Sequence, residues 1–400
     1  MSRIDELIAE LAPGGVRHAA LSDVAAYSST RVDARGLDES SFVGVDNLVA
    51  NKGGRVDASY LPNTARITAY EPGDILLGNI RPYLKKIWRA TSTGGCSGDV
   101  LAIRIDSNAQ DELASEFLYY VLSSDEFFAY NMQHAKGAKM PRGSKSAILK
   151  YRIPLPPLEV QREIVRILDQ FTQLEAELEA ELEARRLQYA HYRDYLLTSV
   201  DGPRLAMGEV GSFIRGRRFT KSDVVEFGIP SIHYGEIYTD YGVSASRAFR
   251  EVRSELSNQL RFAQPRDVIF AGVGETVADV GKAVAWLGDG PVAVHDDTFS
   301  FTSELDPKYV AYAVQSDDFH AQKANHVARG KVKRLSATGL AKIKIPVPSL
   351  QEQDRIVSIL DKLDALVNDL SVGLPAELVA RRKQYEYYRD KLLTFEEAAA

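Results

Sequence analysis

Arginine, histidine and tyrosine side chains gather in one short part of the second half of the chain. Arg215, Arg217 and Arg218 flank a single glycine, and His233-Tyr234 follows at an expected strand end. A guanidinium carries a fork of donors that fits a guanine edge or a phosphate. A solvated surface would also explain one such cluster. A nucleic-acid contact therefore needs a second, independent indication.

Basic loops recur near the far end of each half of the chain. Their cations are Lys136, Lys139, Arg142 and Lys145 in the first half, and Arg329, Lys331, Lys333 and Arg334 in the second. In the first half, Arg81 and Lys85 add a further pair beside Tyr83. Because basic loops recur in both halves while acidic residues collect elsewhere, a nucleic-acid surface is favoured over an ordinary solvated one.

Motifs for catalysis are incomplete. Phe270–Gly274 fits the F-x-G-x-G pattern of adenosylmethionine-dependent methyltransferases, but no Asn/Asp-Pro-Pro-Tyr/Phe motif accompanies it, and a glycine-rich hairpin end explains it equally well. Gly281-Lys282 lacks the glycine and the hydroxyl residue of a P-loop. His295-Asp296-Asp297 could ligate a metal, yet without a second histidine at ligand spacing a strand-end turn is the better interpretation. We expect no catalytic site and no cofactor.

The net charge of −6 conceals an uneven distribution along the chain. Residues 154–200 and 345–400 carry net charges of −4 and −3, whereas residues 1–153 and 201–344 carry 0 and +1. The acidic excess is therefore confined to two segments, and the other two can present a basic face.

Length and composition indicate a multidomain protein. A chain of 400 residues favours about two to three domains, and a single cysteine, Cys96, rules out a disulfide framework or a cysteine-rich metal site. The opening MSRIDELIAELAPGG carries early acids and no apolar core, unlike a signal peptide. No stretch approaches the ~18 apolar residues that a membrane span requires. We expect a soluble, cytoplasmic protein without a membrane partner.

An internal repeat occupies the two acidic segments. IPLPPLEVQREIVRILD (Ile153–Asp169) recurs as IPVPSLQEQDRIVSILD (Ile345–Asp361), with 10 of 17 positions identical. ARRLQYAHYRDYLLT (Ala184–Thr198) recurs as ARRKQYEYYRDKLLT (Ala380–Thr394), with 11 of 15 identical. The offset changes from 192 to 196, so the second copy contains four extra residues.

Each repeat predicts a long helix. Prolines mark the exit from the preceding domain, and neither proline nor glycine interrupts Gln161–Thr198. Apolar residues at 3–4 spacing predict a coiled-coil seam in each copy, and two matching seams favour mutual pairing over ordinary core packing. The extra residues lie in Ser371–Pro375, which predicts a break with one segment ending near Leu370, another starting near Pro375, and Ser371 or Gly373 in between.

The regions between the repeats carry strand and helix signals. Gly73–Leu77 and Arg266–Phe270 are typical of a turn followed by a buried strand, and Val100–Ile105 of another strand. Glu116–Phe128 and Pro307–Phe319 each predict a short amphipathic helix. The predicted fold class is α+β, with two mixed α/β globular domains in a pseudo-two-fold repeat and two long helices. The expected boundaries are 1–153 and 201–344 for the globular domains, and 154–200 and 345–400 for the helices.

These features resemble the specificity subunit of type I restriction–modification systems. Two variable globules are each followed by a P-x-P-x-L-x-x-Q…I-V-x-I-L-D helix that ends in Q-Y-x-x-Y-R-D-x-L-L. Ile4–Ile8, Gly15-Val16 and Gly73–Leu76 are also similar to segments of those subunits. The resemblance implies two target recognition domains that read the halves of a bipartite, asymmetric DNA sequence, an antiparallel coiled-coil spacer, and no catalysis by the chain itself.

The resemblance also implies partners: double-stranded DNA, two adenine-methyltransferase subunits that dock on the spacer, and motor–nuclease subunits. Together with the basic clusters, it leads us to predict the DNA-binding residues Arg31, Arg81, Lys85, Lys139, Arg142, Lys145, Arg215, Arg217, Arg218, Lys221, His233, Tyr234, Lys331, Lys333 and Arg334. The residues assigned to the spacer or to partner docking are Leu174, Leu178, Leu182, Ile356, Leu360 and Leu363. Two alternatives stay open: a coiled-coil adaptor that binds only protein, and a fused methyltransferase or nuclease.

Overall fold

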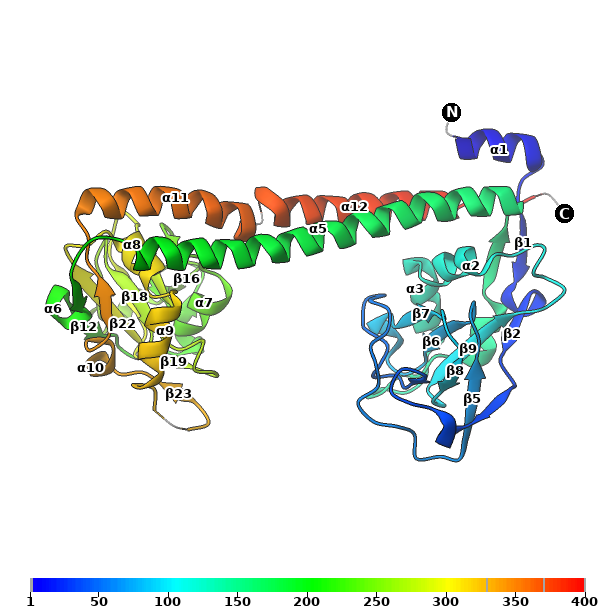
Figure 1. Cartoon of the computed structure of the whole chain (residues 1–400), viewed down its shortest axis with the longest axis horizontal. Coiled ribbons are helices and arrows are strands. Elements are labelled where there is room, and N and C mark those ends of the chain that lie inside the picture. Colours follow the sequence, from blue (N-terminus) through cyan, green and yellow to red (C-terminus); the bar gives the residue numbers. More distant parts are fainter. Residues whose placement is uncertain (1–2, 329, 370, 399–400) are drawn as a thin grey trace. The chain divides into compact units, whose positions relative to one another are not determined.

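The chain divides into two compact units (Figure 1). In this computed structural model, residues 3–328, 330–369 and 371–398 are described. Unit 1 contains residues 1–177 and 378–400, and unit 2 contains residues 178–377. Among the described residues, no helix combines the length and the apolar character needed to cross a membrane.

Unit 1 is built on two four-stranded sheets. The first has the order β2-β9-β6-β7 with antiparallel neighbours, and the second has the order β3-β5-β8-β4. The strands of the first sheet are β2 (Ala25–Tyr27), β6 (Ile75–Gly78), β7 (Ile87–Arg89) and β9 (Val100–Ile105). Those of the second are β3 (Arg31–Asp33), β4 (Phe42–Val43), β5 (Arg66–Tyr70) and β8 (Gly94–Cys96). A separate pair, β1 (Arg17–Ala20) and β10 (Arg152–Leu155), closes the unit beside the long helix.

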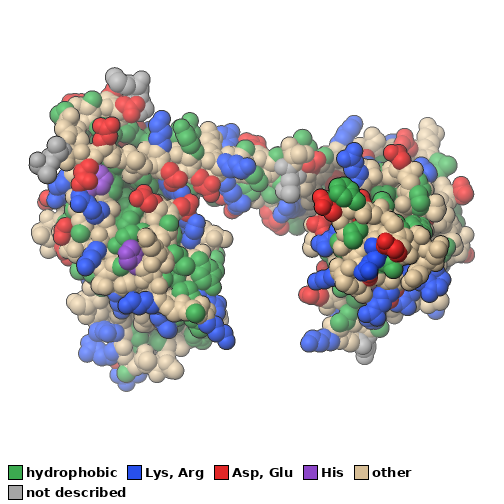
Figure 2. Space-filling view, turned by 180° about the vertical axis from the view of Figure 1, so that it is seen from behind, with side chains coloured by type: hydrophobic (Ala, Val, Ile, Leu, Met, Phe, Trp, Pro, Cys, Tyr) green, Lys and Arg blue, Asp and Glu red, His purple; other side chains and the backbone are tan. Residues whose placement is uncertain are grey.

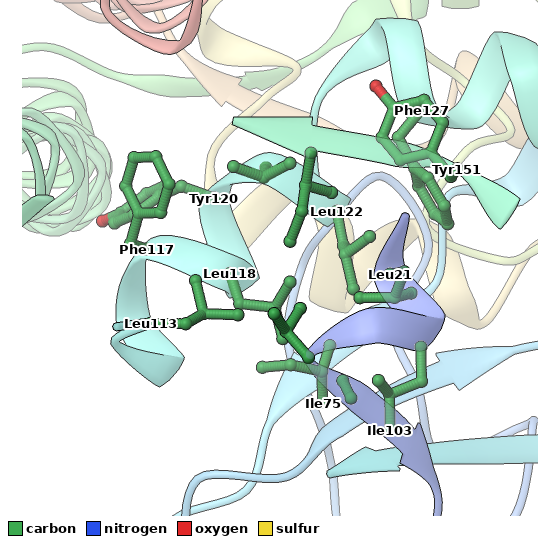
Figure 3. Close-up of a cluster of buried hydrophobic side chains, with 14 of the residues drawn as sticks. Leu21, Ile75, Ile103, Leu113, Phe117, Leu118, Tyr120, Leu122, Phe127 and Tyr151 are labelled. Carbon is green, nitrogen blue, oxygen red and sulfur yellow. The ribbon is translucent and has the colours of Figure 1, made fainter. Parts of the chain in front are cut away.

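Three short helices pack against the first sheet of unit 1, namely α2 (Ser115–Leu122), α3 (Asp125–Gln133) and α4 (Lys145–Lys150). The remaining helix, α1 (Arg3–Leu11), lies against the long helices instead, since Ile4 and Ile8 line a cavity together with Ile167 and Phe171. Figure 3 shows apolar side chains of α2, such as Leu118 and Leu122, above Ile75 of β6 and Ile103 of β9. Burial of these side chains on one face of the sheet supplies the main hydrophobic stabilisation of the unit.

Unit 2 repeats this plan with a larger strand set. One sheet has the order β12-β22-β18-β20-β15 and the other β13-β16-β14-β21-β17. The strands of the first are β12 (Gly211–Arg215), β15 (Ser244–Ala245), β18 (Val268–Ala271), β20 (Ala283–Trp286) and β22 (Thr298–Ser303). Those of the second are β13 (Val224–Val225), β14 (Ile229–Ile232), β16 (Arg250–Val252), β17 (Phe262–Ala263) and β21 (Val292–Val294). Two further pairs are β11 (Arg204–Ala206) with β24 (Lys344–Pro346), and β19 (Val273–Gly274) with β23 (Lys333–Arg334).

The short helices of unit 2 are α6 (Met207–Val210), α7 (Tyr234–Thr239), α8 (Pro307–Ala313), α9 (Asp317–Ala324) and α10 (Ala337–Leu340). The order β12-β22-β18-β20 matches β2-β9-β6-β7 of unit 1. The registers agree as well, because Ile75 pairs with Ile103 in unit 1 and Val268 with Phe301 in unit 2. Positions in the two units can therefore be compared residue by residue.

The predicted buried strands are confirmed. The prediction of one continuous amphipathic helix in each unit is wrong. The segment 116–128 is split between α2 and α3, and the segment 307–319 between α8 and α9. At each break a serine, Ser124 or Ser316, accepts a hydrogen bond from the backbone N–H three residues later. A serine at this position caps a new helix, and that local bond outweighed the apolar periodicity.

The long helices follow the prediction. Helix α5 runs without interruption over Leu158–Thr198, whereas the second copy is broken into α11 (Leu350–Asn368) and α12 (Gly373–Leu393). Ser371 lies in the break as predicted, but Gly373, with φ of 76°, already begins α12, and Leu370 lies outside the described residues. In unit 1, α12 runs antiparallel to α5, since Phe171 contacts Tyr388 and Glu175 pairs with Arg382.

The leucines of the four-residue unit in α5 do not share one environment. Leu182 is buried and Leu178 is half-buried, while Leu174 is 49% exposed. Four residues advance by about 400° on a helix, so each successive leucine turns by about 40° away from the previous one. Of the three leucines predicted to form the apolar seam, only Leu182 is therefore fully buried. Ile356 and Leu360 of α11 are fully buried, and Leu363 is half-buried.

A buried glutamine joins each globule to its helix. Gln161 donates to the carbonyls of Pro156 and Glu112, both at 2.7 Å, and accepts from the N–H of Ala114 at 2.9 Å. At the repeated position, Gln353 donates to the carbonyl of Pro348 at 2.9 Å and accepts from the N–H of Asp306 at 2.8 Å. These are the glutamines of the repeated motif.

A tyrosine–aspartate hydrogen bond reinforces each glutamine joint. Tyr120 of α2 donates to Asp169 at 2.6 Å, and Tyr312 of α8 donates to Asp361 at 2.8 Å. Each bond links the globule to the helix about two turns beyond the glutamine. The two joints thus share their plan, and Gln161 adds a further bond to Glu112.

Replacing Gln353 by Leu should lower the free energy of unfolding of unit 2 by about 2–4 kcal/mol, because two buried backbone groups lose their partner. The two tryptophans, Trp88 and Trp286, lie in different units, so a Trp88→Phe background leaves Trp286 to report unit 2 in urea. Gln351→Leu, at an exposed position of the same helix, is the matched control and should change little. Equal effects of the two substitutions would contradict the claim that the hydrogen bonds of Gln353 stabilise unit 2.

Candidate nucleic-acid interface

Two loops rich in Lys and Arg close over the same strand end in each unit. We call residues 136–142 and 328–334 the basic hairpins; residue 329, one of the predicted basic positions, lies outside the described residues. In unit 1, Lys136 and Arg142 exchange two backbone hydrogen bonds of 2.9 Å. In unit 2, Ala328 and Arg334 form the corresponding bridge. The two predicted basic loops thus share one backbone conformation at their base.

Each basic hairpin is tied to the segment that follows the central strand of the sheet. Ile80, beyond β6, bridges Arg142, and Val273, beyond β18, pairs with Arg334. The next residue repeats the attachment: the N–H of Gly143 donates to the carbonyl of Asn79, and that of Leu335 to Gly272. Figure 1 places β19 and β23 at the end of unit 2 away from α11.

An aspartate holds the arginine of each hairpin. The Nε of Arg142 lies 3.2 Å from Oδ1 of Asp99, and Nη1 of Arg334 lies 3.2 Å from Oδ1 of Asp297. Asp99 precedes β9 and Asp297 precedes β22, which are equivalent strands. The arginine side chains are nevertheless 55% and 58% exposed. Each guanidinium is therefore fixed at one edge and open at the other.

Buried polar side chains lie behind the hairpins at equivalent positions, Asn131 of α3 and Lys323 of α9, and the sequence analysis did not predict them. Lys323 is fully buried and donates to the carbonyl of Ala278 at 3.0 Å, and burial lowers its pKa to about 8. Among the described residues, the Asn131 amide has no hydrogen-bond partner, nor has the side-chain oxygen of Asn79. A Cβ on Gly143 would lie 2.5 Å from the Asn131 side-chain oxygen, so glycine lets the hairpin approach these amides.

Unit 2 has a second group of predicted residues at the end of β12. Arg217, Arg218 and Lys221 are exposed, whereas Arg215 donates through Nε to the backbone carbonyl of Asp296 at 2.6 Å. Gly216 is required here, since a Cβ would lie 2.1 Å from the carbonyl oxygen of His295. The tight backbone turn thus projects Arg217 and Arg218 into solvent.

Two histidines, a tyrosine and a phenylalanine pack beside this turn. His233 caps α7 by accepting from the N–H of Gly235 at 3.2 Å, and its ring lies 4.3 Å from that of His295 and 4.4 Å from that of Tyr234. His295 also contacts Phe219 at 5.0 Å between ring centroids. Burial and the neighbouring His295 lower the pKa of His233 to about 4. His233 is therefore a neutral, half-buried support rather than a free cation at neutral pH.

The cluster His295-Asp296-Asp297 forms a strand-end turn before β22, as the sequence favoured. Its potential ligand atoms lie within 4.8 Å of one another, but the imidazole already contacts the Phe219 carbonyl and accepts from the Asp297 N–H. The Asp297 carboxylate pairs with Arg334. The negative charge of this turn is thus balanced by arginine.

A cavity of about 250 Å³ brings two predicted clusters together in unit 2. Arg215 and Arg334 both line it. Phe299 of β22 and Gly272, which belongs to the Phe270–Gly274 segment, line it as well. Gly272 and Gly274 continue into β19 and a turn held by Thr276 and Asp279, not into a helix. Of the two interpretations of Phe270–Gly274, the structure thus favours a glycine-rich hairpin end over a methyltransferase motif.

The predicted residues of unit 1 do not form one cluster. Arg81, with φ of 53°, donates its backbone N–H to the Pro141 carbonyl and so lies beside the basic hairpin. Lys85 instead contacts the Asp125 carboxylate at 2.6 Å. Arg31 lies on β3 of the other sheet, and Lys145 is exposed at the first turn of α4.

The sequence did not identify the partners of Asp125 in unit 1. Besides Lys85, this carboxylate contacts Lys52 at 3.1 Å and the buried Arg389 of α12 at 3.0 Å. Arg389 is identical in both copies of the helix motif, which was the available signal. The arrangement ties the loop after Arg81 to the helix.

The remaining predicted cations lie on the surface of their units. Lys139 and Lys331 are exposed in the two basic hairpins, and Lys333 is half-buried, with its ammonium donating to the Gly330 carbonyl at 2.9 Å. Figure 2 shows Lys and Arg side chains gathered at the lower end of each unit. The site geometry is thus a set of short basic loops on sheet ends.

Comparison with known proteins agrees with this geometry. Residues 96–184 and 206–380 match the type I restriction modification DNA specificity domain. The chain belongs to the type I restriction–modification specificity family. A relative of Haemophilus influenzae, named as a candidate type I restriction enzyme specificity subunit, is 30% identical over 72% of this chain and 74% of its own length.

Other members of the specificity family extend the comparison. The specificity subunit of the type I restriction enzyme EcoR124I/EcoR124II of Escherichia coli is 34% identical over 61% of this chain, and the alignment spans 63% of that relative. A solved chain from a study of complex assembly in a type I restriction–modification system has 19% identity and a TM-score of 0.65, covering 95% of this chain and 98% of its own. The latter match shows that the two chains share a fold.

The histidines predict how unit 2 responds to acid. Burial lowers the pKa of His233 and of His320 to about 4, below the unfolded value of 6.5. Above pH ~6.5 both states are neutral; as the pH falls toward 4 the unfolded chain binds protons first, so stability is lost across this window.

His233→Asn keeps a side-chain oxygen that can cap α7 and removes one titrating group. We expect the urea midpoint of unit 2, read from Trp286 in the Trp88→Phe background, to fall less between pH 7 and 5 in this variant than in the parent. Identical pH dependence in the two proteins would contradict the assignment.

Proposed function

We propose that this specificity-family member recognises a bipartite, asymmetric DNA sequence, one half through each unit, and directs methylation and restriction by partner subunits. The observation that carries the proposal is the pair of basic hairpins, built at equivalent positions on matching sheets of two otherwise different units. Half-sites about one helical turn apart can be read along one face of DNA.

The proposed recognition domains are residues 1–153 and 201–344, with residues 154–200 and 345–400 as the spacer. The glutamine joints support boundaries close to these, because Gln161 and Gln353 bind the carbonyls of Pro156 and Pro348, which lie just beyond the proposed end of each globule. The recognition surface would comprise the predicted cations of the hairpins and of the β12 end, with His233 as a support.

Two methyltransferase subunits would dock on the helices, and motor–nuclease subunits would complete the restriction enzyme. The support is the repeated helix motif: Tyr192 and Tyr388 occupy the same position in the two copies and are 45% and 39% exposed. Two equivalent surfaces on one chain suit two copies of one partner. The family match favours neither a protein-only adaptor nor a fused methyltransferase.

Replacing Arg217 and Arg218 together by Ala should weaken binding through the second half-site, with each lost base-reading fork costing about 1–3 kcal/mol. The assay is a titration of the assembled complex against its cognate duplex. Trp286 fluorescence serves as the folding control, since these side chains are exposed. Unchanged affinity would remove the β12 end from the interface.

The tandem four-residue unit in α5 suggests that this helix acts as a ruler, so that its length sets the gap between the two half-sites. Inserting one Leu-Glu-Ala-Glu unit after Glu181 should lengthen the helix by about 6 Å and rotate its end by about 40°. The rotation is close to the about 34° of one base pair, so it favours a change of one base pair although the added length exceeds the ~3.4 Å rise. The break between α11 and α12 can absorb the change on the other side. Mapping of methylated adenines should show a gap one base pair longer with both half-sites unchanged; the same gap in an active complex would refute the ruler.

A further inference from the structure

The two units share the arginine of the basic hairpin, whereas the basic group at the end of β12 occurs in unit 2 alone. Arg142 and Arg334 are each bridged to the residue after the central strand and each held by an aspartate at 3.2 Å. By contrast, the β12 end has no counterpart in unit 1. Tyr27 and Phe213 occupy the same place in the matching registers, so Ser29 of unit 1 stands where unit 2 has Arg215.

The surroundings of the two shared arginines select a polyanion. No acidic residue occurs between residues 133 and 150 or between residues 325 and 336. The same two segments contain Lys136, Lys139 and Lys331, so the sequence around each arginine is positively charged. Arg142 uses its Nε for Asp99, which leaves both terminal nitrogens for another acceptor. Arg334 uses Nη1 for Asp297, which leaves Nε and Nη2. A fork held at one edge by a carboxylate is preorganised for two oxygens.

The two half-sites of an asymmetric target differ in base sequence and share the sugar–phosphate backbone. A contact that is identical in both units therefore fits what the half-sites share, since base identity would require different side chains. Resting on the proposed function, we propose that Arg142 and Arg334 are phosphate clamps that grip the DNA backbone at equivalent places in the two half-sites. Base identity is then read by groups that the units do not share, among them Arg217 and Arg218.

The test uses the chain assembled with its methyltransferase subunits. Arg142→Ala and Arg334→Ala are compared in binding to cognate and to unrelated duplexes over a range of salt, and in the methylation motif. Each contact to one phosphate contributes about 0.9 to the slope of log affinity against log salt, so each variant should lose about 0.9 of slope and bind about eightfold more weakly at ~0.1 M salt. The loss should be equal for both duplexes, and the motif should stay unchanged.

Two control variants keep the outcome interpretable. Arg17→Ala removes an arginine that is also exposed, at 57%, and also carboxylate-paired, with Glu112, but lies on β1, and it should leave affinity and slope unchanged. Arg142→Lys keeps the charge and should restore most of the slope. Fluorescence of Trp88 and Trp286 checks that both units remain folded.

Three results would overturn the clamps. A motif that relaxes at one position would make the arginine a base reader, an unchanged slope would place it outside the interface, and loss of a bound methyltransferase subunit would make the hairpin a protein-docking surface. The failure of the proposed function itself has a different signature: the unaltered complex would then bind cognate and unrelated duplexes equally.

Discussion

The architecture depends on one kind of interaction, a buried glutamine that hydrogen-bonds only to backbone groups. Gln161 and Gln353 each satisfy a carbonyl at the globule exit and an N–H at the start of the helix pair α2–α3 or α8–α9. Because an unsatisfied buried amide is costly, each glutamine fixes where its globule meets the helix. Apart from Tyr120 and Tyr312, side chains on the globule are free to differ, since each glutamine contacts only backbone groups.

Regular parts of the fold could be predicted from the sequence because they follow simple periodicities. The uninterrupted α5, the break before Gly373 and the buried strands β6, β9 and β18 all follow from apolar spacing and from the placement of proline and glycine. The splits at Ser124 and Ser316 were missed, because a single capping bond outweighed the apolar pattern. Local polar chemistry of this kind leaves a weak sequence signal.

The candidate site was predictable in its residue types but not in its geometry. The recurrence of basic loops was visible, yet the aspartates that hold Arg142 and Arg334 come from strands about 40 residues away along the chain. Lys85 shows the converse, because its cluster with Arg81 gave no hint that its ammonium contacts Asp125. Which cations are fixed and which are free depends on strand register, and that register forms only in the folded sheet.

The glutamine joint has a consequence for how such proteins diversify. A genetic exchange that falls within the repeated segments transplants a complete globule, with its hairpin and its aspartate, onto an unchanged joint. The incoming globule must supply a backbone N–H for the glutamine, as Ala114 and Asp306 do, and a tyrosine for the aspartate of the helix, as Tyr120 and Tyr312 do. Recombination between unrelated globules can thus generate a new pairing of globules in one event, without a period of instability in the helices.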